Sequence, residues 1–250
     1  MPITYLRNLT GKDRSTLANW QLARYLAFVA GAINAGGFLA VHQYTSHMTG
    51  IVSAMADDLA VGHAALMLAG LGALICFVAG AALSAMLVNW ARRVRLHSQY
   101  ALPLMVEAAL LLCFGLLGGN LERREWLFVP ATVAVLCFIM GLQNALITKL
   151  SRAEIRTTHV TGMVTDIGIE LGKLFYWNLT EGEGAARVVA DRRKLVMLAT
   201  LVGLFFVGGA AGALGFKQVG FGMTVLFAAL LGALAAVPVW DDLRRLASRR

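Results

Sequence analysis

Charged residues are scarce in this chain, and the acidic ones are the scarcer of the two signs. Asp, Glu, Lys and Arg make up 14% of the 250 residues, whereas an average soluble domain has about 25%. Hydrophobic residues make up 58%. This composition excludes a soluble globular domain, and it excludes a disordered chain, which has few apolar residues. The sequence therefore predicts a membrane protein with several spans.

Cysteine and proline are also rare, with three and four residues respectively. Cys76, Cys113 and Cys137 are far apart in the sequence and form no paired motif. A disulfide-rich secreted module is thereby excluded, and the cysteines are interpreted as small apolar packing groups. No histidine lies in the H-E-x-x-H pattern of zinc peptidases. We therefore expect no metal and no cofactor, and we favour a protein that is not an enzyme.

Long apolar runs are what the chain has in abundance. A helix needs roughly 20 mostly apolar residues to cross a bilayer core, and six runs are of that order. They are residues 22–41, 64–90, 102–119, 127–148, 195–216 and 219–240. An even number of crossings places both termini on the same side. The predicted fold is an all-α polytopic membrane protein with six transmembrane helices.

Basic residues are distributed unevenly over the segments between these runs. All of the 22 Lys and Arg except Arg123, Arg124 and Lys217 fall on the side that holds the termini. Cytoplasmic segments carry the excess of basic residues in membrane proteins, so both termini are predicted to be cytoplasmic. The net charge of +8 is therefore a topology signal. It predicts contact with the lipid bilayer and no nucleic-acid partner.

The N-terminal segment does not resemble a cleavable signal peptide. Residues 1–20 are polar, and no small-residue cleavage pattern follows the first apolar run. We expect this run to stay in the mature protein as a signal anchor. The predicted location is the cytoplasmic (inner) membrane of a bacterium.

Two polar stretches, 45–50 and 157–162, share the pattern T-[S/T]-H-x-T-G. The pattern G-x-x-N-A precedes each of them, at 31–35 and 141–145. Further downstream, F-V-A-G-A-A at 77–82 resembles F-V-G-G-A-A at 206–211. A match this dense in uncommon residue types indicates an internal repeat.

The polar segments 45–62 and 157–174 are too short to be counted as further crossings. If they crossed, basic loops would move to the outside and weaken the charge asymmetry. We therefore predict two re-entrant or half-spanning helices, one in each of two inverted repeats, as in many secondary transporters. The predicted parts are a cytoplasmic segment 1–21, repeats at 22–119 and 127–240, and a basic cytoplasmic tail 241–250. Gly208 and Gly212 form a G-x-x-x-G step for helix packing within the subunit or in a homodimer.

The motif residues are candidates for a substrate or ion pathway. They are Thr45, His47, Thr49 and Gly50 in the first half, and Arg156, Thr157, Thr158, His159, Thr161 and Gly162 in the second. The hydroxyls suit the capping of helix starts, and the glycines suit a turn or close approach to a ligand. A helix start attracts an anionic or carbonyl-bearing group. The histidines titrate near neutral pH, or they are structural hydrogen bonders.

Carboxylates and amides in apolar surroundings complete the candidate pathway. Asp58 and Glu170 are equivalent by repeat, and Asp166 lies one turn before Glu170 on the same helix face. Glu107 lies inside the third span, where it is protonated, paired with a basic group, or lining a cavity. Asn34 and Asn144, also equivalent, either line the pathway or join helices. The alternative for the acids near the ends is that they face water.

The second-half motif carries a family resemblance. At residues 140–145 (M-G-L-Q-N-A) and 155–162 (I-R-T-T-H-V-T-G) the sequence resembles the YoaK-like family, and 166–172 (D-I-G-I-E-L-G) is similar too. The resemblance implies a bacterial six-span membrane protein, but it implies no substrate or reaction. Asn34 and Ile51 depart from the family pattern, which favours an acid and an Asn at these positions.

Three functions are compatible with these features. A transporter of a small solute or ion requires both polar motifs to meet around a polar path, and the near-equal preservation of the motifs favours it. An intramembrane enzyme would use His159 with Asp166 or Glu170. A non-transporting scaffold or receptor would have no continuous polar path. We expect the transporter.

Overall fold

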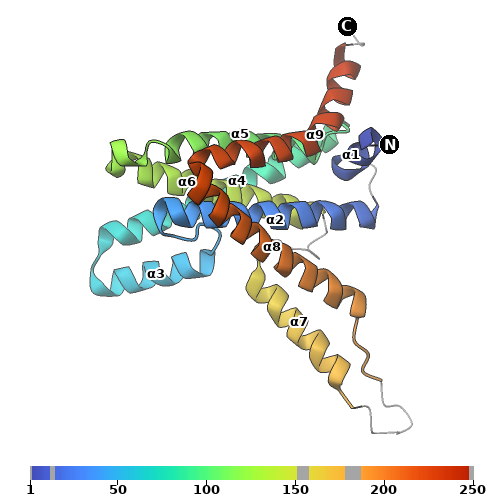
Figure 1. The fold of residues 1–250 in the computed structure, drawn as a ribbon, viewed down its shortest axis with the longest axis horizontal. Helices are drawn as coiled ribbons and strands as arrows, with labels where there is room; N and C mark the ends of the chain where they lie inside the picture. The colour runs from blue at the N-terminus through green and yellow to red at the C-terminus, as the bar shows by residue number, and fades with distance from the viewer. Residues whose placement is uncertain (1, 12–14, 151–157, 178–186, 248–250) are drawn as a thin grey trace.

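The computed structural model describes residues 2–11, 15–150, 158–177 and 187–247. These residues form helices and short connections, and none of them lies in a strand. The helices are α1 (Pro2–Thr10), α2 (Thr16–Val41), α3 (Met48–Val61), α4 (Ala64–Arg93), α5 (Ala101–Gly118), α6 (Glu125–Leu150), α7 (Val160–Phe175), α8 (Arg192–Val219) and α9 (Met223–Ala247), with 3₁₀ turns η1 (Leu121–Arg123) and η2 (Gly220–Gly222). Figure 1 shows their arrangement.

Five helical segments of the described chain are long and apolar enough to cross a membrane. Four of them are α2, α4, α5 and α6, and the fifth, Arg192–Ala247, contains both α8 and α9. The chain reverses at η2, so α9 runs back along the bundle (Figure 1). This protein is an all-α polytopic membrane protein, as its composition predicts.

Local sequence explains where several helices begin and end. The Ser15 hydroxyl accepts the Ala18 N–H at the start of α2, and the Asp191 carboxylate accepts two N–H groups at the start of α8. Both are N-caps that satisfy otherwise free donors. The C-cap that follows α3 is Gly62, whose φ of 85° suits a residue without a Cβ. α9 bends before its C-terminal end (Figure 1), where Pro238 interrupts the helix ladder.

Two closely packed helix pairs form the centre of the bundle, α2 with α8 and α4 with α6. Each helix contributes one Phe-x-x-Gly step to its crossing. The steps are Phe28–Gly31, Phe77–Gly80, Phe138–Gly141 and Phe205–Gly208. Each glycine faces the backbone carbonyl of the phenylalanine on its partner helix, and any side chain there would overlap that oxygen. The glycines therefore allow the helix backbones to touch.

The packing corrects the register of the downstream repeat. Sequence similarity pairs Phe77 with Phe206, whereas the helix crossings make Phe77 equivalent to Phe205, and Gly80 to Gly208. Phe206 points outward and is 75% exposed. The two adjacent phenylalanines look alike in sequence, but only one faces a partner backbone.

The G-x-x-x-G step of α8 is used within the chain. Gly208 packs on the backbone of Phe28, and Gly212 packs on the backbone of Ala32. Both glycines are buried. The subunit itself therefore covers this small-residue face.

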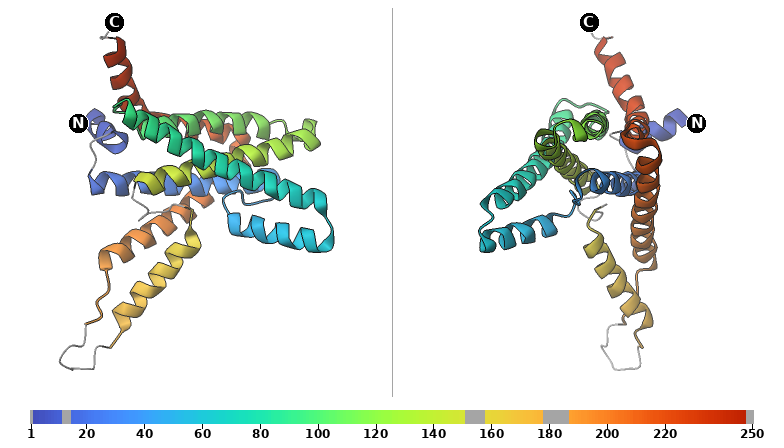
Figure 2. Two further views of the ribbon diagram at one scale, coloured as in Figure 1. Left: turned by 180° about the vertical axis from the view of Figure 1, so that it is seen from behind. Right: turned by 60° about the vertical axis from the view of Figure 1, so that its left-hand side comes forward.

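The two short helices lie beside the central pairs, α3 along α4 and α7 along α8. Figures 1 and 2 show that their N-terminal ends approach the middle of the molecule, close to each other in every view. From there α3 and α7 run in divergent directions, and α7 with the first part of α8 projects from the bundle.

The chain ends are held at one end of the bundle. Arg7 of α1 forms an ion pair with Asp241 of α9, with Nε and Oδ2 2.6 Å apart. The neighbouring Asp242 is buried and accepts the backbone N–H groups of His97 and Ser98, in the connection between α4 and α5. The segment 1–21, predicted only as a polar cytoplasmic segment, thus contains a packed helix.

Candidate functional site

The start of each short helix is tied to the preceding long helix by one side-chain hydrogen bond. The Ser46 hydroxyl donates to Asn34 Oδ1 over 2.8 Å, and the Thr158 hydroxyl donates to Asn144 Oδ1 over 2.6 Å. Ser46 and Thr158 occupy the second position of the repeated motif, and Asn34 and Asn144 occupy the Asn position of G-x-x-N-A. We call these two bonds the asparagine clamps.

The clamps change the role predicted for the hydroxyls. The N-cap residues of α3 and α7 are His47 and His159, and neither helix has a side-chain cap hydrogen bond there. The hydroxyls of Ser46 and Thr158 instead bind asparagine side chains. The prediction that these hydroxyls cap backbone N–H groups was therefore wrong for Ser46 and Thr158, whose hydroxyls donate to the asparagine oxygens while neither helix start has a side-chain cap.

Gly50 and Gly162 do not form turns. Each lies in the first turn of its helix, and neither has a positive φ. A side chain at Gly50 would meet the His47 ring at Nδ1, so this glycine leaves room for the imidazole over the helix start. A side chain at Gly162 would meet no atom within 4 Å. Only the first glycine has a contact that explains it.

His47, Gly50 and Asp58 line one cavity of about 740 Å³ between α3, α4 and α6. The rest of its lining is mainly apolar and includes no residue of α7. A wider cavity of about 1200 Å³ lies between the end of α2 and the connection from α5 to α6. The two cavities share His42, Val129 and Pro130. We refer to these two adjoining cavities together as the recess, and its smaller part reaches the start of α3.

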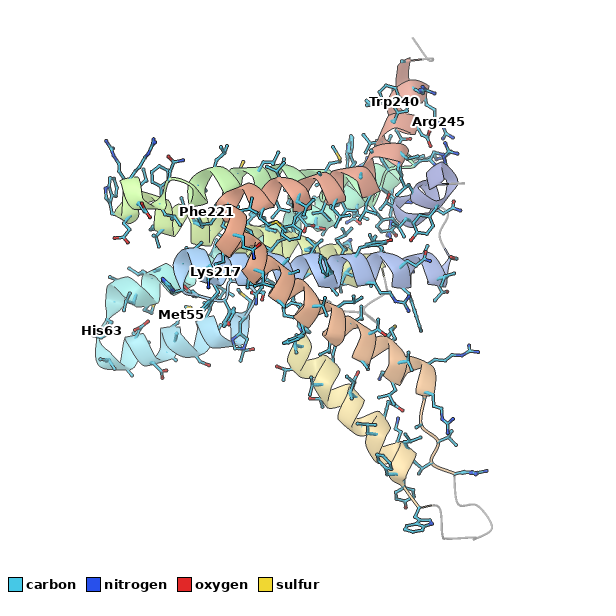
Figure 3. The ribbon with its side chains drawn as sticks, viewed as in Figure 1. Met55, His63, Lys217, Phe221, Trp240 and Arg245 are labelled. Atoms are coloured by element: carbon cyan, nitrogen blue, oxygen red, sulfur yellow. The ribbon has the colours of Figure 1, made fainter. Side chains whose placement is uncertain are left out.

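Asp58 lies at the far end of α3 from the motif. Its carboxylate is 3.7 Å from Nδ1 of His63, which begins α4. Figure 3 places His63 at the tip of the α3–α4 hairpin and Met55 between the two helices. Asp58 thus lines the recess and also contacts His63 at the tip of the α3–α4 hairpin.

Glu170 and Asp166 join α7 to the start of α8. Glu170 is buried, and its carboxylate accepts Lys173 Nζ and the Asp191 N–H, each over 2.8 Å. The Lys173 ammonium and the Asp191 N–H hold the pKa of Glu170 below its usual range. Asp166 pairs with Lys194 over 3.1 Å. Both acids therefore face α8, as their shared helix face predicts.

Glu107 is completely buried in α5. Gln143 Nε2 on α6 donates to Glu107 Oε1 over 2.8 Å. Among the described residues no basic group pairs with this carboxyl. The expectation of a basic partner is thereby excluded within the described chain, and the protonated alternative is favoured because an unpaired buried carboxylate is costly.

The other predicted residues are placed as follows. Thr45 is buried next to Gly37 of α2, and its hydroxyl has no hydrogen-bond partner among the described residues. Thr49 and Thr161 are exposed in the first turns of α3 and α7. Arg156 and Thr157 lie outside the described residues.

Sequence reasoning missed two residues that the structure brings into the site. Ser46 belongs to the motif but is not among the predicted pathway residues, although it matches Thr158. Gln143 lies inside the G-x-x-N-A pattern and is the partner of Glu107. The repeat in the sequence is sufficient to predict Ser46 from its match to Thr158. The role of Gln143 becomes visible only from the packing of α5 on α6.

Comparison with known proteins identifies the family. A family model described as "Protein of unknown function (DUF1275)" matches residues 22–237. The chain belongs to the DUF1275 family. It is also 28% identical to the UPF0700 transmembrane protein YoaK of Bacillus subtilis (strain 168) over 159 residues, which cover 62% of this chain and 68% of that protein. No solved structure matches the chain.

The DUF1275 match covers both asparagine clamps, the recess and the Glu107–Gln143 pair. The resemblance to the YoaK-like family is thereby confirmed. Among the described residues there is no group of three His, Cys, Asp or Glu side chains that could hold a metal ion. The arrangement offers hydroxyls, amides, imidazoles and helix starts, which are groups that bind a solute reversibly.

Proposed function

We propose that this DUF1275 protein is a transporter of a small solute or ion, with a pathway that passes the starts of α3 and α7. One observation carries the proposal. Both motif elements make the same hydrogen bond to the same residue of the preceding helix, at starts of short helices that approach each other. A hydrogen bond with a purely structural role would not need to occur in both halves of the chain. Alternating exposure of one binding site to the two sides of a membrane uses two equivalent halves.

An inverted arrangement of the two halves is part of this proposal. The crossing of α2 with α8 and that of α4 with α6 use equivalent Phe-x-x-Gly steps, and α3 packs on α4 as α7 packs on α8. This exchange of partners supports a two-fold relation between the halves. In the proposed topology α3 enters from outside and α7 from the cytoplasm, with both termini cytoplasmic in the inner membrane.

The chemistry at the two helix starts favours an anionic or carbonyl-bearing solute. A helix start carries partial positive charge and free N–H donors. The buried, unpartnered Thr45 hydroxyl adds a donor directly before α3. The recess from His42 to His47 provides an approach from the outer side.

The alternatives are weaker on specific grounds. An intramembrane enzyme would need Asp166 or Glu170 free to act with His159, but these acids are engaged by Lys194 and Lys173. A non-transporting scaffold or receptor has no need for matched clamps. The scaffold is therefore the second candidate, and flux measurements distinguish it.

The test uses purified protein in liposomes on a solid-supported membrane. Transport currents are recorded for a panel of chloride, bicarbonate, formate, acetate, phosphate and small dicarboxylates. We expect a current with at least one of these anions in the wild type and a loss of at least tenfold in the double variant Ser46→Ala, Thr158→Ala. The matched control is Thr200→Ala, since the hydroxyl of the half-buried Thr200 donates to the Val196 carbonyl of its own helix.

The outcomes separate the candidates. An anion current lost in the double variant and retained in the control supports the proposal. A current that survives removal of both clamps places the pathway elsewhere. Absence of any current across the panel favours the scaffold.

A further inference from the structure

Glu107 and Gln143 form a buried hydrogen-bonded pair in which two side-chain oxygens have no hydrogen-bond partner among the described residues. Gln143 Nε2 donates to Glu107 Oε1, while Glu107 Oε2 and Gln143 Oε1 have no partner among the described residues. Both residues are fully buried. If the carboxyl were ionised, two acceptor atoms and a negative charge would be stranded in an apolar helix bundle, which is strongly unfavourable.

A single proton on Glu107 would neutralise the buried charge and provide both unpartnered oxygens with a hydrogen bond. A carboxylic acid and a primary amide can pair through two hydrogen bonds, N–H to C=O and O–H to C=O. The first of these is present, and the two unpartnered oxygens are the donor and acceptor sites of the second. We propose that Glu107 binds a proton on Oε2, which then donates to Gln143 Oε1, and that this pair is a proton-binding site of the protein.

The helices packed around α5 supply no basic side chain that pairs with Glu107 in the described structure, so a proton is the cation that neutralises this carboxyl. α5 packs against α6, α9, α4 and η2. Their charged or titratable residues are Glu125, Cys137 and Lys149 on α6, Asp241, Asp242, Arg244 and Arg245 on α9, and Cys76, Arg92 and Arg93 on α4. The charged ones lie near helix ends, where Lys149 bonds to Asn89, Arg92 to Gln99 and Asp242 to backbone N–H groups. None of them pairs with Glu107 in the described structure.

The pair is placed next to one of the two clamps. Gln143 precedes Asn144 in the chain, and Asn144 accepts the Thr158 hydroxyl at the start of α7 while its Nδ2 donates to the Met140 carbonyl. This adjacency offers a short route by which a change at Gln143 would reach the residue that holds α7. The equivalent position in the first half is Ile33, which cannot bind a carboxyl. The proton site belongs to the second half alone, and its use for coupling to solute movement rests on the proposed function.

Infrared difference spectroscopy tests the proton directly. We compare wild type with Glu107→Gln, in which the new amide can form the same two hydrogen bonds and so preserve the fold. Near neutral pH the difference spectrum is expected to show the C=O stretch of one protonated carboxyl that exchanges in D₂O. In Gln143→Leu the same band is expected at higher wavenumber, because the hydrogen-bonding partner is gone.

The matched control is Glu170→Gln, since Glu170 is held as a carboxylate by Lys173 and the Asp191 N–H. Its difference spectrum is expected to show carboxylate bands only. If the wild-type minus Glu107→Gln spectrum also shows carboxylate bands alone near neutral pH, the proton site is refuted. This readout involves no transport, so a protonated Glu107 in a protein without flux would refute the proposed function and leave the proton site standing.

Coupling to α7 has its own measurement. In a background without Cys76, Cys113 and Cys137, a cysteine replaces Thr161, which is exposed in the first turn of α7. Its labelling rate is expected to change at least threefold between neutral and alkaline pH after correction for thiolate formation, and to stay constant in Glu107→Gln. Thr49→Cys, the equivalent position on α3, is the control and should not respond. Equal pH responses with and without Glu107 would refute the coupling.

Discussion

At the residue scale, the four candidate acids of the pathway have two different surroundings. Asp58, Asp166 and Glu170 lie where a cation or imidazole reaches them, whereas Glu107 is buried with an amide as its partner. The sequence shows that all four residues are acids, but it does not show which of them has a cation or imidazole as its neighbour and which has an amide. This distinction separates the acids that contact a cation or an imidazole from Glu107, for which we propose a bound proton.

Glu170 gives a prediction with a definite pH dependence. Because its pKa is lowered in the folded protein, its contribution to stability is present above the ordinary carboxyl pKa and is lost as pH falls through the lowered value. We expect acidification to lower the protection factor of the Asp191 amide, measured against its intrinsic exchange rate at each pH, because its N–H binds the carboxylate. In Glu170→Gln, exchange at Asp191 should already be fast at neutral pH.

The control for this experiment is Asp57→Asn, because Asp57 is exposed on α3, the other short helix. That variant should keep the wild-type acid response at Asp191. A protection factor at Asp191 that stays constant throughout the acid range in the wild type would contradict a role for the ionised carboxylate.

At the element scale, glycine placement determines which helices touch. The four Phe-x-x-Gly steps bring backbones together in two reciprocal crossings. At some other glycines of the same long helices, such as Gly203 on α8, an added Cβ would meet no atom within 4 Å. The sequence does not distinguish the glycines at helix crossings from the other glycines. Only the contact with a partner backbone shows which glycines are needed for packing.

A pair of glycine substitutions on α8 tests this difference. Gly208→Ala places a methyl group against the Phe28 carbonyl, and it is expected to lower the free energy of unfolding by about 2 kcal/mol, as overpacking does. Gly203→Ala meets no atom and should be neutral or slightly stabilising, since alanine favours a helix. Thermal unfolding in detergent measures both. Equal effects of the two substitutions would argue against the crossing.

At the scale of the whole molecule, the repeated halves exchange partners. α2 of the first half packs on α8 of the second, and α6 of the second packs on α4 of the first. Neither half could bury its glycine faces alone. The protein is therefore expected to fold as one unit, with the starts of α3 and α7 brought together as a consequence of the two crossings.

Topology is tested by cysteine labelling in cells, again without the native cysteines. Asn120→Cys, between α5 and α6, should react with a membrane-impermeant reagent from outside. Arg95→Cys, between α4 and α5, should react only after the membrane is opened, because the basic loops are predicted to be cytoplasmic. Labelling of Arg95→Cys in intact cells would reverse the proposed orientation.

The sequence by itself determined the class of the protein, because scarce charge and long apolar runs are incompatible with any soluble fold. It also located both motif elements, since Thr, His, Gly and Asn recur at matching spacings. It could not choose Phe205 over Phe206, find the helix α1, or match Gln143 to Glu107, because these depend on which side of a helix meets a neighbour. Only the tertiary structure decided those contacts, since packing selects among residues that look alike in sequence.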